Sequence, residues 1–148
     1  MKPGIFGSDP YQAYQQMVAL VQQQRWAEAL TAGRTFVNAP LFVSARDRAQ
    51  GYYLMGICYN ELAQYADAEK MYEEAARNDA DNPEISLALW YNRARNQYRW
   101  GISLYNSGKQ SESQPHFHQA MNCALKARTI DPDDSDTQHL IALIQHAH

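Results

Sequence analysis

Residues 49–80 read AQGYYLMGICYNELAQYADAEKMYEEAARNDA, and this stretch decides how the chain is expected to fold. Its apolar and aromatic side chains recur at three- and four-residue intervals in two segments of about 14 residues each, which predicts two amphipathic helices. Residues 63–65 form a short turn between the segments, so the helices are expected to pack antiparallel. Gly56 and Ala68 are small enough to let the two backbones approach closely. The remaining interface positions are Tyr52, Met55, Tyr59, Tyr72 and Ala75.

This stretch resembles the consensus of the tetratricopeptide repeat, a helix hairpin of about 34 residues. The matching positions are Tyr52, Met55, Gly56 and Tyr59 in the first helix, Tyr65 at the turn, and Ala68, Tyr72 and Ala75 in the second helix. Ala80 replaces the proline that usually closes the repeat. The resemblance implies an all-α fold, in which helix hairpins stack into a short right-handed α-solenoid.

A weaker copy of the repeat precedes this one, over residues 10–43. Trp26 and Ala29 occupy the diagnostic places at the start of its second helix. Its first helix is expected to begin after Ser8-Asp9-Pro10, a capping residue followed by a first-turn proline. Met17 stands where the consensus has glycine, so we expect this helix pair to be spread more widely. Residues 1–9 are then an N-terminal extension.

A third copy, over residues 83–132, is longer than the family pattern. Gly56 and Gly101 are 45 residues apart, against about 34 in a regular array. Ala120 lies seven positions further beyond the turn residue Gly108 than Ala68 lies beyond Ala63. Both insertions are close to whole helical turns, so they should lengthen helices without rotating their faces.

The insertions therefore predict an elongated third hairpin. Its first helix covers residues 83–106 with Asn82 as the cap, and its second runs from near Ser113, or from Ser111, to about Ile130. A last helix over residues 135–147 is expected to cover the apolar face of the final repeat, as repeat arrays require. Its apolar positions are Leu140, Ile141, Leu143 and Ile144. The prediction is a single domain over residues 10–148 with seven helices.

Composition and charge restrict the function. The chain has 45% hydrophobic residues and a formal net charge of −3, which indicates a globular protein and disfavours nucleic-acid binding through a basic face. No apolar run approaches the roughly 18 residues of a membrane span, and the first residues lack the apolar core of a signal peptide. We therefore expect a cytoplasmic protein that binds no nucleic acid and does not insert into membranes.

Motifs of catalysis are missing from the sequence. It contains neither a Gly-rich phosphate loop nor a GxSxG elbow. Cys58 lies on an apolar helix face and far from Cys123, which favours a buried hydrophobe over a reactive thiol or a disulfide. His116 and His118 are two positions apart on a predicted helix, so their side chains diverge and a metal site is disfavoured. We predict no enzymatic activity, no cofactor, no metal and no small-molecule substrate.

The family resemblance implies a binding surface, because the first helix of each repeat lines a concave groove that holds a segment of another protein. Carried over position by position, the groove residues are Tyr11, Tyr14 and Val18 in the first repeat, Gln50, Tyr53, Ile57 and Asn60 in the second, and Tyr91, Arg95, Tyr98, Arg99, Ile102 and Tyr105 in the third. Tyrosine is favoured at interfaces because it offers a large contact area and a polar tip at low entropic cost. The open alternative is a groove that the chain's own terminal segments fill.

Some members of the family clamp the C-terminal carboxylate of chaperones. Arg95 and Arg99 occupy the third-repeat places of that clamp, but Tyr14, Val18 and Leu54 stand where its other residues should be. We therefore predict no chaperone-tail binding of this type.

Two functions remain. The first is a non-enzymatic adaptor, scaffold or chaperone-like module that binds a partner segment in the tyrosine-lined groove. The alternative is a structural subunit or homodimer that assembles through the long third hairpin, whose Arg93, Arg95 and Arg99 could meet Glu69, Glu73 and Glu74 of a second copy.

Overall fold

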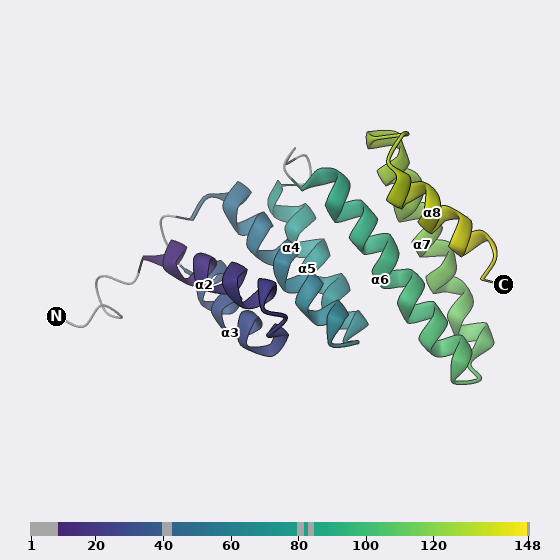
Figure 1. Ribbon diagram of the computed structural model, residues 1–148, viewed down its shortest axis with the longest axis horizontal. Coiled ribbons are helices and arrows are strands. Elements are labelled where there is room, and N and C mark those ends of the chain that lie inside the picture. The colour runs from purple at the N-terminus through teal and green to yellow at the C-terminus, as the bar shows by residue number, and fades with distance from the viewer. Residues whose placement is uncertain (1–8, 40–42, 80–81, 83–84, 148) are drawn as a thin grey trace.

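The computed structural model describes residues 9–39, 43–79, 82 and 85–147, and these residues form seven α-helices and no strand. The helices are α2 (Pro10–Gln22), α3 (Trp26–Val37), α4 (Ala45–Glu61), α5 (Tyr65–Asp79), α6 (Ser86–Asn106), α7 (Gln110–Ile130) and α8 (Ser135–Gln145). Figure 1 shows them side by side in chain order. The predicted all-helical class and the seven helices are confirmed.

Three hairpins, α2–α3, α4–α5 and α6–α7, turn in the same way. One residue of each turn has a left-handed backbone: Gln24 and Ala63 at φ 59°, and Gly108 at φ 80°. The next N–H then donates to a carbonyl five positions earlier at 2.9 Å, in the pairs Arg25–Leu20, Gln64–Tyr59 and Lys109–Leu104. Gly108 adopts this conformation without a Cβ penalty, which costs about 1 kcal/mol at Gln24 and at Ala63.

In each hairpin a large side chain on one helix faces a glycine on the other, and the two residues are always 16 positions apart. Gly56 faces the ring of Tyr72, and Gly101 faces that of Phe117, so closely that a Cβ on either glycine would overlap the ring. The first hairpin reverses the order, with Met17 on α2 against Gly33 on α3. Gly33 supplies on the second helix the small residue that Met17 replaces on the first. The wider spread expected of this helix pair stays a prediction.

The extra length of the third hairpin lies at its open end and not next to its turn. Ser113, five positions after Gly108, is fully buried like Ala68, five positions after Ala63. Ser113 and not Ala120 is thus the equivalent of Ala68, and the predicted insertion beside the turn is wrong. Instead, the start of α6 lies about one helical turn further from Gly101 than the start of α4 lies from Gly56. The end of α7 likewise lies more than one turn further past Phe117 than the end of α5 lies past Tyr72.

The third hairpin is also displaced along its axis relative to the second. The turn residues show this: Ala63 and Gly108 are separated along the chain by six positions more than Gln24 and Ala63 are. The bonds between hairpins change less. Tyr14 bonds Gln50 and Asn60 bonds Asn96 across 36 residues, while Tyr53 bonds Asn92 across 39. The third turn therefore extends further past the second than the second extends past the first, and Figure 1 shows the α6–α7 turn projecting beyond the α4–α5 turn.

Helix ends follow the capping residues in most places. Asp9 accepts a bond from Tyr11 N at 2.9 Å, Ser44 from Asp47 N at 3.1 Å, and Asp134 from Thr137 N at 2.9 Å. The start of α6 is later than predicted. Asn82 is fully buried, and its carbonyl accepts the N–H of Ser86 at 2.8 Å, while residues 83 and 84 lie outside the described part. The second helix of this hairpin starts earlier than predicted, at Gln110.

The last helix covers the open end of the third hairpin. Leu140, Ile141 and Ile144 are buried in a cluster with Ala94 of α6 and Ala124 of α7. Leu143, which was expected to share this face, is 39% exposed. Within the described ranges, no helix combines the length and apolar character needed to cross a membrane.

Candidate functional site

The predicted groove residues of α2 are used to join the first two hairpins. Tyr11 donates to Asp47 at 2.6 Å and Tyr14 donates to Gln50 at 3.1 Å. Both rings pack on Phe36, with centroids 5.6 and 5.0 Å away. The bond to Asp47 raises the pKa of Tyr11, because ionisation would break it and place two negative charges together. These tyrosines therefore act in the contact between α2 and α4. Val18 lies beside them, partly buried.

Two of the predicted groove residues of α4, Tyr53 and Asn60, contact α6. Asn60 is buried, donates to Asn96 at 2.7 Å and accepts from Arg99 at 2.5 Å. Tyr53 accepts a bond from Asn92 at 3.1 Å, and burial raises its pKa. Asn60 consequently cannot hold partner groups in the way the sequence suggested. Ile57 stays partly buried.

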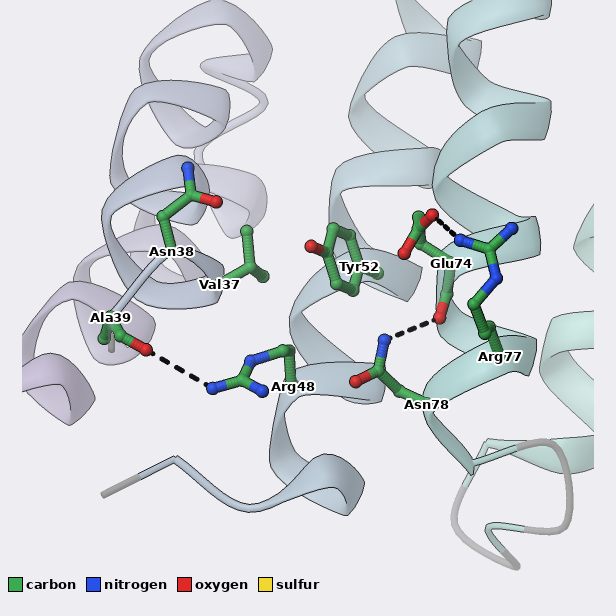
Figure 2. Close-up of a pocket in the computed structure, with 8 residues that line it drawn as sticks. All are labelled: Val37, Asn38, Ala39, Arg48, Tyr52, Glu74, Arg77 and Asn78. Atoms are coloured by element: carbon green, nitrogen blue, oxygen red, sulfur yellow. Dashed lines mark hydrogen bonds and ion pairs between the residues drawn. The ribbon is translucent and has the colours of Figure 1, made fainter. Parts of the chain in front are cut away.

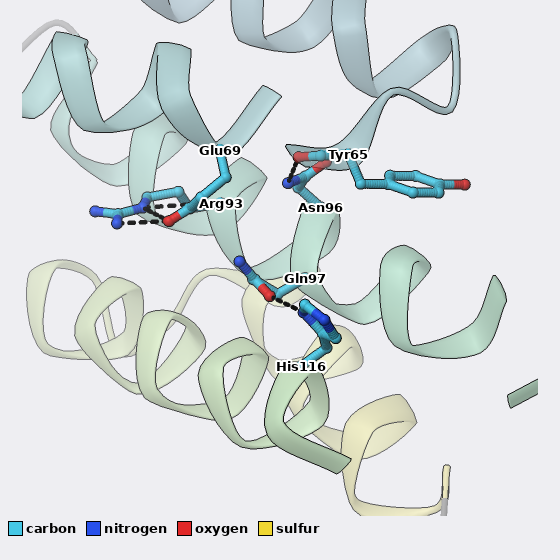
Figure 3. A network of polar contacts seen from close by, with 6 residues as sticks. All are labelled: Tyr65, Glu69, Arg93, Asn96, Gln97 and His116. Atoms are coloured by element: carbon cyan, nitrogen blue, oxygen red, sulfur yellow. Dashed lines mark hydrogen bonds and ion pairs between the residues drawn. The ribbon is translucent and has the colours of Figure 1, made fainter. Parts of the chain in front are cut away.

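The basic residues of α6 find acidic partners inside the chain. Arg93 holds the carboxylate of Glu69 with bonds of 2.7 to 3.3 Å, as Figure 3 shows. Arg95 and Arg99 both lie near Glu61, at 3.6 and 3.7 Å. Trp90 of α6 is flanked by two cations, Arg93 at 5.0 Å and Lys126 at 4.4 Å from its ring. The charges that suggested pairing with a second copy are therefore largely matched within one chain.

The predicted residues near the end of α6 do form a recess. Tyr98, Arg99, Ile102 and Ser103 line a hollow of about 240 Å³ together with Tyr65, the first residue of α5. Tyr105, one turn further, is 39% exposed. The recess exists because the displaced third hairpin extends past the start of α5. We call Tyr65, Tyr98, Arg99, Ile102, Ser103 and Tyr105 the overhang surface.

Tyr91 lies in a separate hollow near the other end of α6. This cavity of about 280 Å³ is also lined by Asn92 of α6 and by Asp134 and Asp136 at the start of α8. Burial, then the charges of the two aspartates, raise the pKa of Tyr91. Tyr91 and the overhang surface lie toward opposite ends of α6. Most of the predicted groove residues of α6 therefore fall into two separate hollows, while Arg95 pairs with Glu61.

The two cysteines are buried, and His116 already has partners within the chain. Burial raises the pKa of Cys58 to about 12 and that of Cys123 to about 11, so both thiols stay protonated at neutral pH. His116 stacks on Trp100 with ring centroids 4.0 Å apart, and its Nδ1 lies 2.8 Å from Gln97 (Figure 3). Burial lowers the pKa of His116. Among the residues with described positions, no three His, Cys, Asp or Glu side chains gather in a way that would hold a metal ion.

A cavity of about 550 Å³ lies between α3, α4 and α5 (Figure 2), and the sequence did not predict it. Its walls carry Arg48 of α4 and Arg77 of α5, with Glu74 paired to Arg77. The signal that could have found it is Arg48 itself, a charged residue one position before the buried Ala49.

Comparison with protein-family models finds no match for this chain, and comparison with curated proteins finds none either.

Proposed function

We propose that this protein is a non-enzymatic binding module of the tetratricopeptide type that holds a segment of another protein on the overhang surface. Two features of the three hairpins support the repeat type. Each has one left-handed residue at the same place in its turn, and each has the same spacing between a glycine and the large side chain that faces it. Hairpins so alike in geometry are what an internally repeated fold requires.

The overhang surface carries the functional part of the proposal. It keeps an aromatic residue, Tyr105, with 39% of its surface in solvent, next to a recess that has both apolar and cationic walls. Tyrosine and arginine beside a concave pocket are the combination in which binding hot spots concentrate. Tyr11, Tyr14 and Tyr53 are less suited to this role, because their hydroxyl groups already bond within the chain.

This geometry also selects the variant that tests the proposal. Replacing Tyr53 would break its bond to Asn92, and replacing Tyr98 would remove its ring from Phe117, 6.2 Å away. Loss of binding in such variants would not be separable from loss of structure. The double variant Ile102→Ser/Tyr105→Ala alters the rim of the recess and leaves those contacts in place.

The experiment captures partners from a lysate of the source organism with the tagged full chain, and then measures the affinity of each captured protein by titration. We expect the double variant to bind at least about tenfold more weakly than wild type. Leu143→Ala is the matched control, since Leu143 on α8 is also 39% exposed. If the double variant and the control bind alike, with thermal unfolding unchanged in both, the overhang surface is not the binding site.

The alternative of self-assembly loses part of its basis, because Arg93, Arg95 and Arg99 have acidic partners in the same chain. Light scattering of the purified protein at tens of micromolar separates the two functions. A monomer agrees with the binding module, and a stable dimer would favour the structural subunit.

A further inference from the structure

The cavity between α3, α4 and α5 contains an arginine that has no acidic partner among the described residues. Arg48 donates from Nη2 to the carbonyls of Ala39 and Val43 at 3.3 and 3.4 Å, both long bonds. Its Nε is closed to solvent and finds no acceptor in the described part of the chain. A guanidinium has five N–H donors and is charged at all physiological pH values. Arg48 is therefore under-satisfied, and a buried donor without an acceptor calls for an explanation.

A second arginine of the same chain shows which group would satisfy it. Arg93 precedes Gly101 by eight positions, as Arg48 precedes Gly56, so the two occupy equivalent positions in their hairpins. Arg93 faces the second helix of the preceding hairpin, where Glu69 accepts bonds from both its Nε and its Nη2. Arg48 likewise packs toward the preceding hairpin, yet no ion pair to it forms among the described residues.

The surroundings of Arg48 are suited to a negatively charged group. Two arginines and one glutamate line the cavity, and that glutamate, Glu74, pairs with Arg77. The lining thus keeps one net positive charge. Figure 2 shows Arg48 between the end of α3 and the Glu74–Arg77 pair, with the ring of Tyr52 above it. The space of about 550 Å³ would admit a few residues of an extended peptide.

We propose that this cavity is a second binding site, which takes a carboxylate of a peptide segment and places it on Arg48. The carboxylate replaces the two long carbonyl bonds with a bidentate, charge-assisted pair of the kind that Arg93 makes. Arg48 turns its Nε toward the ligand as the carboxylate enters. The site lies on α3, α4 and α5 and does not involve the overhang surface, so either site can fail without the other.

The test uses the full ¹⁵N-labelled chain and three short probes, observed by NMR through the Nε–Hε signal of Arg48 and the amide signals of Tyr52 and Asn78. The probes are Ac-Ala-Asp-Ala-NH₂, its asparagine analogue, and Ac-Ala-Ala-Ala with a free C-terminal carboxylate. We expect saturable shifts with the carboxylate probes and none with the asparagine peptide. Stronger binding of the aspartate probe identifies an internal acidic side chain as the occupant, and stronger binding of the third probe identifies a chain end.

Variants assign the effect to the guanidinium. Arg48→Met should weaken binding at least about tenfold. Arg48→Lys keeps the positive charge but loses the two parallel N–H donors of the guanidinium, so it should bind the carboxylate probes more weakly than wild type. It also serves as the folded variant if Arg48→Met does not fold. Arg34→Met, on the exposed face of α3, should bind like wild type. Equal shifts with the aspartate and asparagine peptides, no saturable shift with either carboxylate, or wild-type binding by folded Arg48→Met or Arg48→Lys would each overturn the proposal.

Discussion

The first hairpin and the other two place the small residue of their helix crossing on opposite helices. Gly56 and Gly101 stand on the first helix, against the rigid rings of Tyr72 and Phe117, whereas the first hairpin sets flexible Met17 against Gly33 on its second helix. What is preserved is the pair of facing positions and not the residue at either one. Close helix packing needs one small member in the pair, and either helix can supply it.

The two junctions between hairpins differ as well. Neutral tyrosine hydroxyls donate to Asp47 and Gln50 where α2 meets α4. Arginine–carboxylate pairs and buried asparagines join the second hairpin to the third. A displaced hairpin brings long basic side chains of α6 opposite the acidic residues of α4 and α5. Hydroxyl donors thus hold the first junction, and pairs of opposite charge hold the second.

The largest effect is expected from giving the middle hairpin the first hairpin's large residue. Gly56→Met places a long side chain against the Tyr72 ring, so we expect it to lower the free energy of unfolding by about 3 kcal/mol or more. Adding Tyr72→Gly restores the arrangement of the first hairpin and should recover part of that loss. Urea unfolding of both variants measures this. A double variant no more stable than the sum of its single changes predicts would contradict the exchange of roles.

Breaking the charged junction should have the next largest effect. Glu69→Gln leaves Arg93 without a carboxylate at a site where both side chains are 17% exposed, and we expect a loss of about 2 kcal/mol. Glu28→Gln is the control. It breaks the pair with Arg25, whose side chains are 51% and 57% exposed, and should cost less than about 0.5 kcal/mol. Similar losses in both variants would show that the junction gains nothing from its charges.

Alanine at the two kinds of glycine should give a smaller difference. Gly101→Ala brings Cβ to 2.7 Å from the Phe117 ring, which outweighs the helical advantage of alanine and should cost about 1 kcal/mol. Gly33→Ala meets atoms of Met17 and Met55 at 2.7 to 3.0 Å. These flexible side chains can shift, so its stability should stay within about 0.5 kcal/mol of wild type. Thermal unfolding compares the two, and the reverse order would refute the distinction.

The smallest effect is a pH dependence specific to the third hairpin. Burial lowers the pKa of His116 in the folded protein, so the unfolded chain binds more protons between the two pKa values. Stability should therefore fall as the pH drops from about 6.5 toward the folded pKa, and be fully present above that range. His116→Phe keeps a ring against Trp100 and should flatten the slope. An unchanged slope in this variant would assign the pH dependence to other groups.

The repeat signal predicted the helices well because it depends on local periodicity and capping. Residues 49–80 predicted α4 and α5, and Asp9 and Pro10 predicted the start of α2. The signal failed where packing depends on a partner far along the chain. Met17 cannot be interpreted without Gly33, and Ser113 is hidden because serine in place of alanine does not look like a core residue. For the site, the family resemblance pointed to Tyr98, Arg99, Ile102 and Tyr105, which line or border the recess. It could not show that Asn60 is buried, since that follows from the displacement of the third hairpin.

The order of contacts along the chain has a consequence for how the molecule folds. Within the described residues, α2 and α3 pack closely only against each other and against α4, and α8 packs closely only against α6 and α7. Each hairpin can then form and add to its neighbour without closing a long loop, which favours rapid folding. The second and third hairpins both have neighbours on two sides, the third through α8. Their amide protons should therefore exchange most slowly with solvent, while α2–α3 and α8 open first and independently of each other.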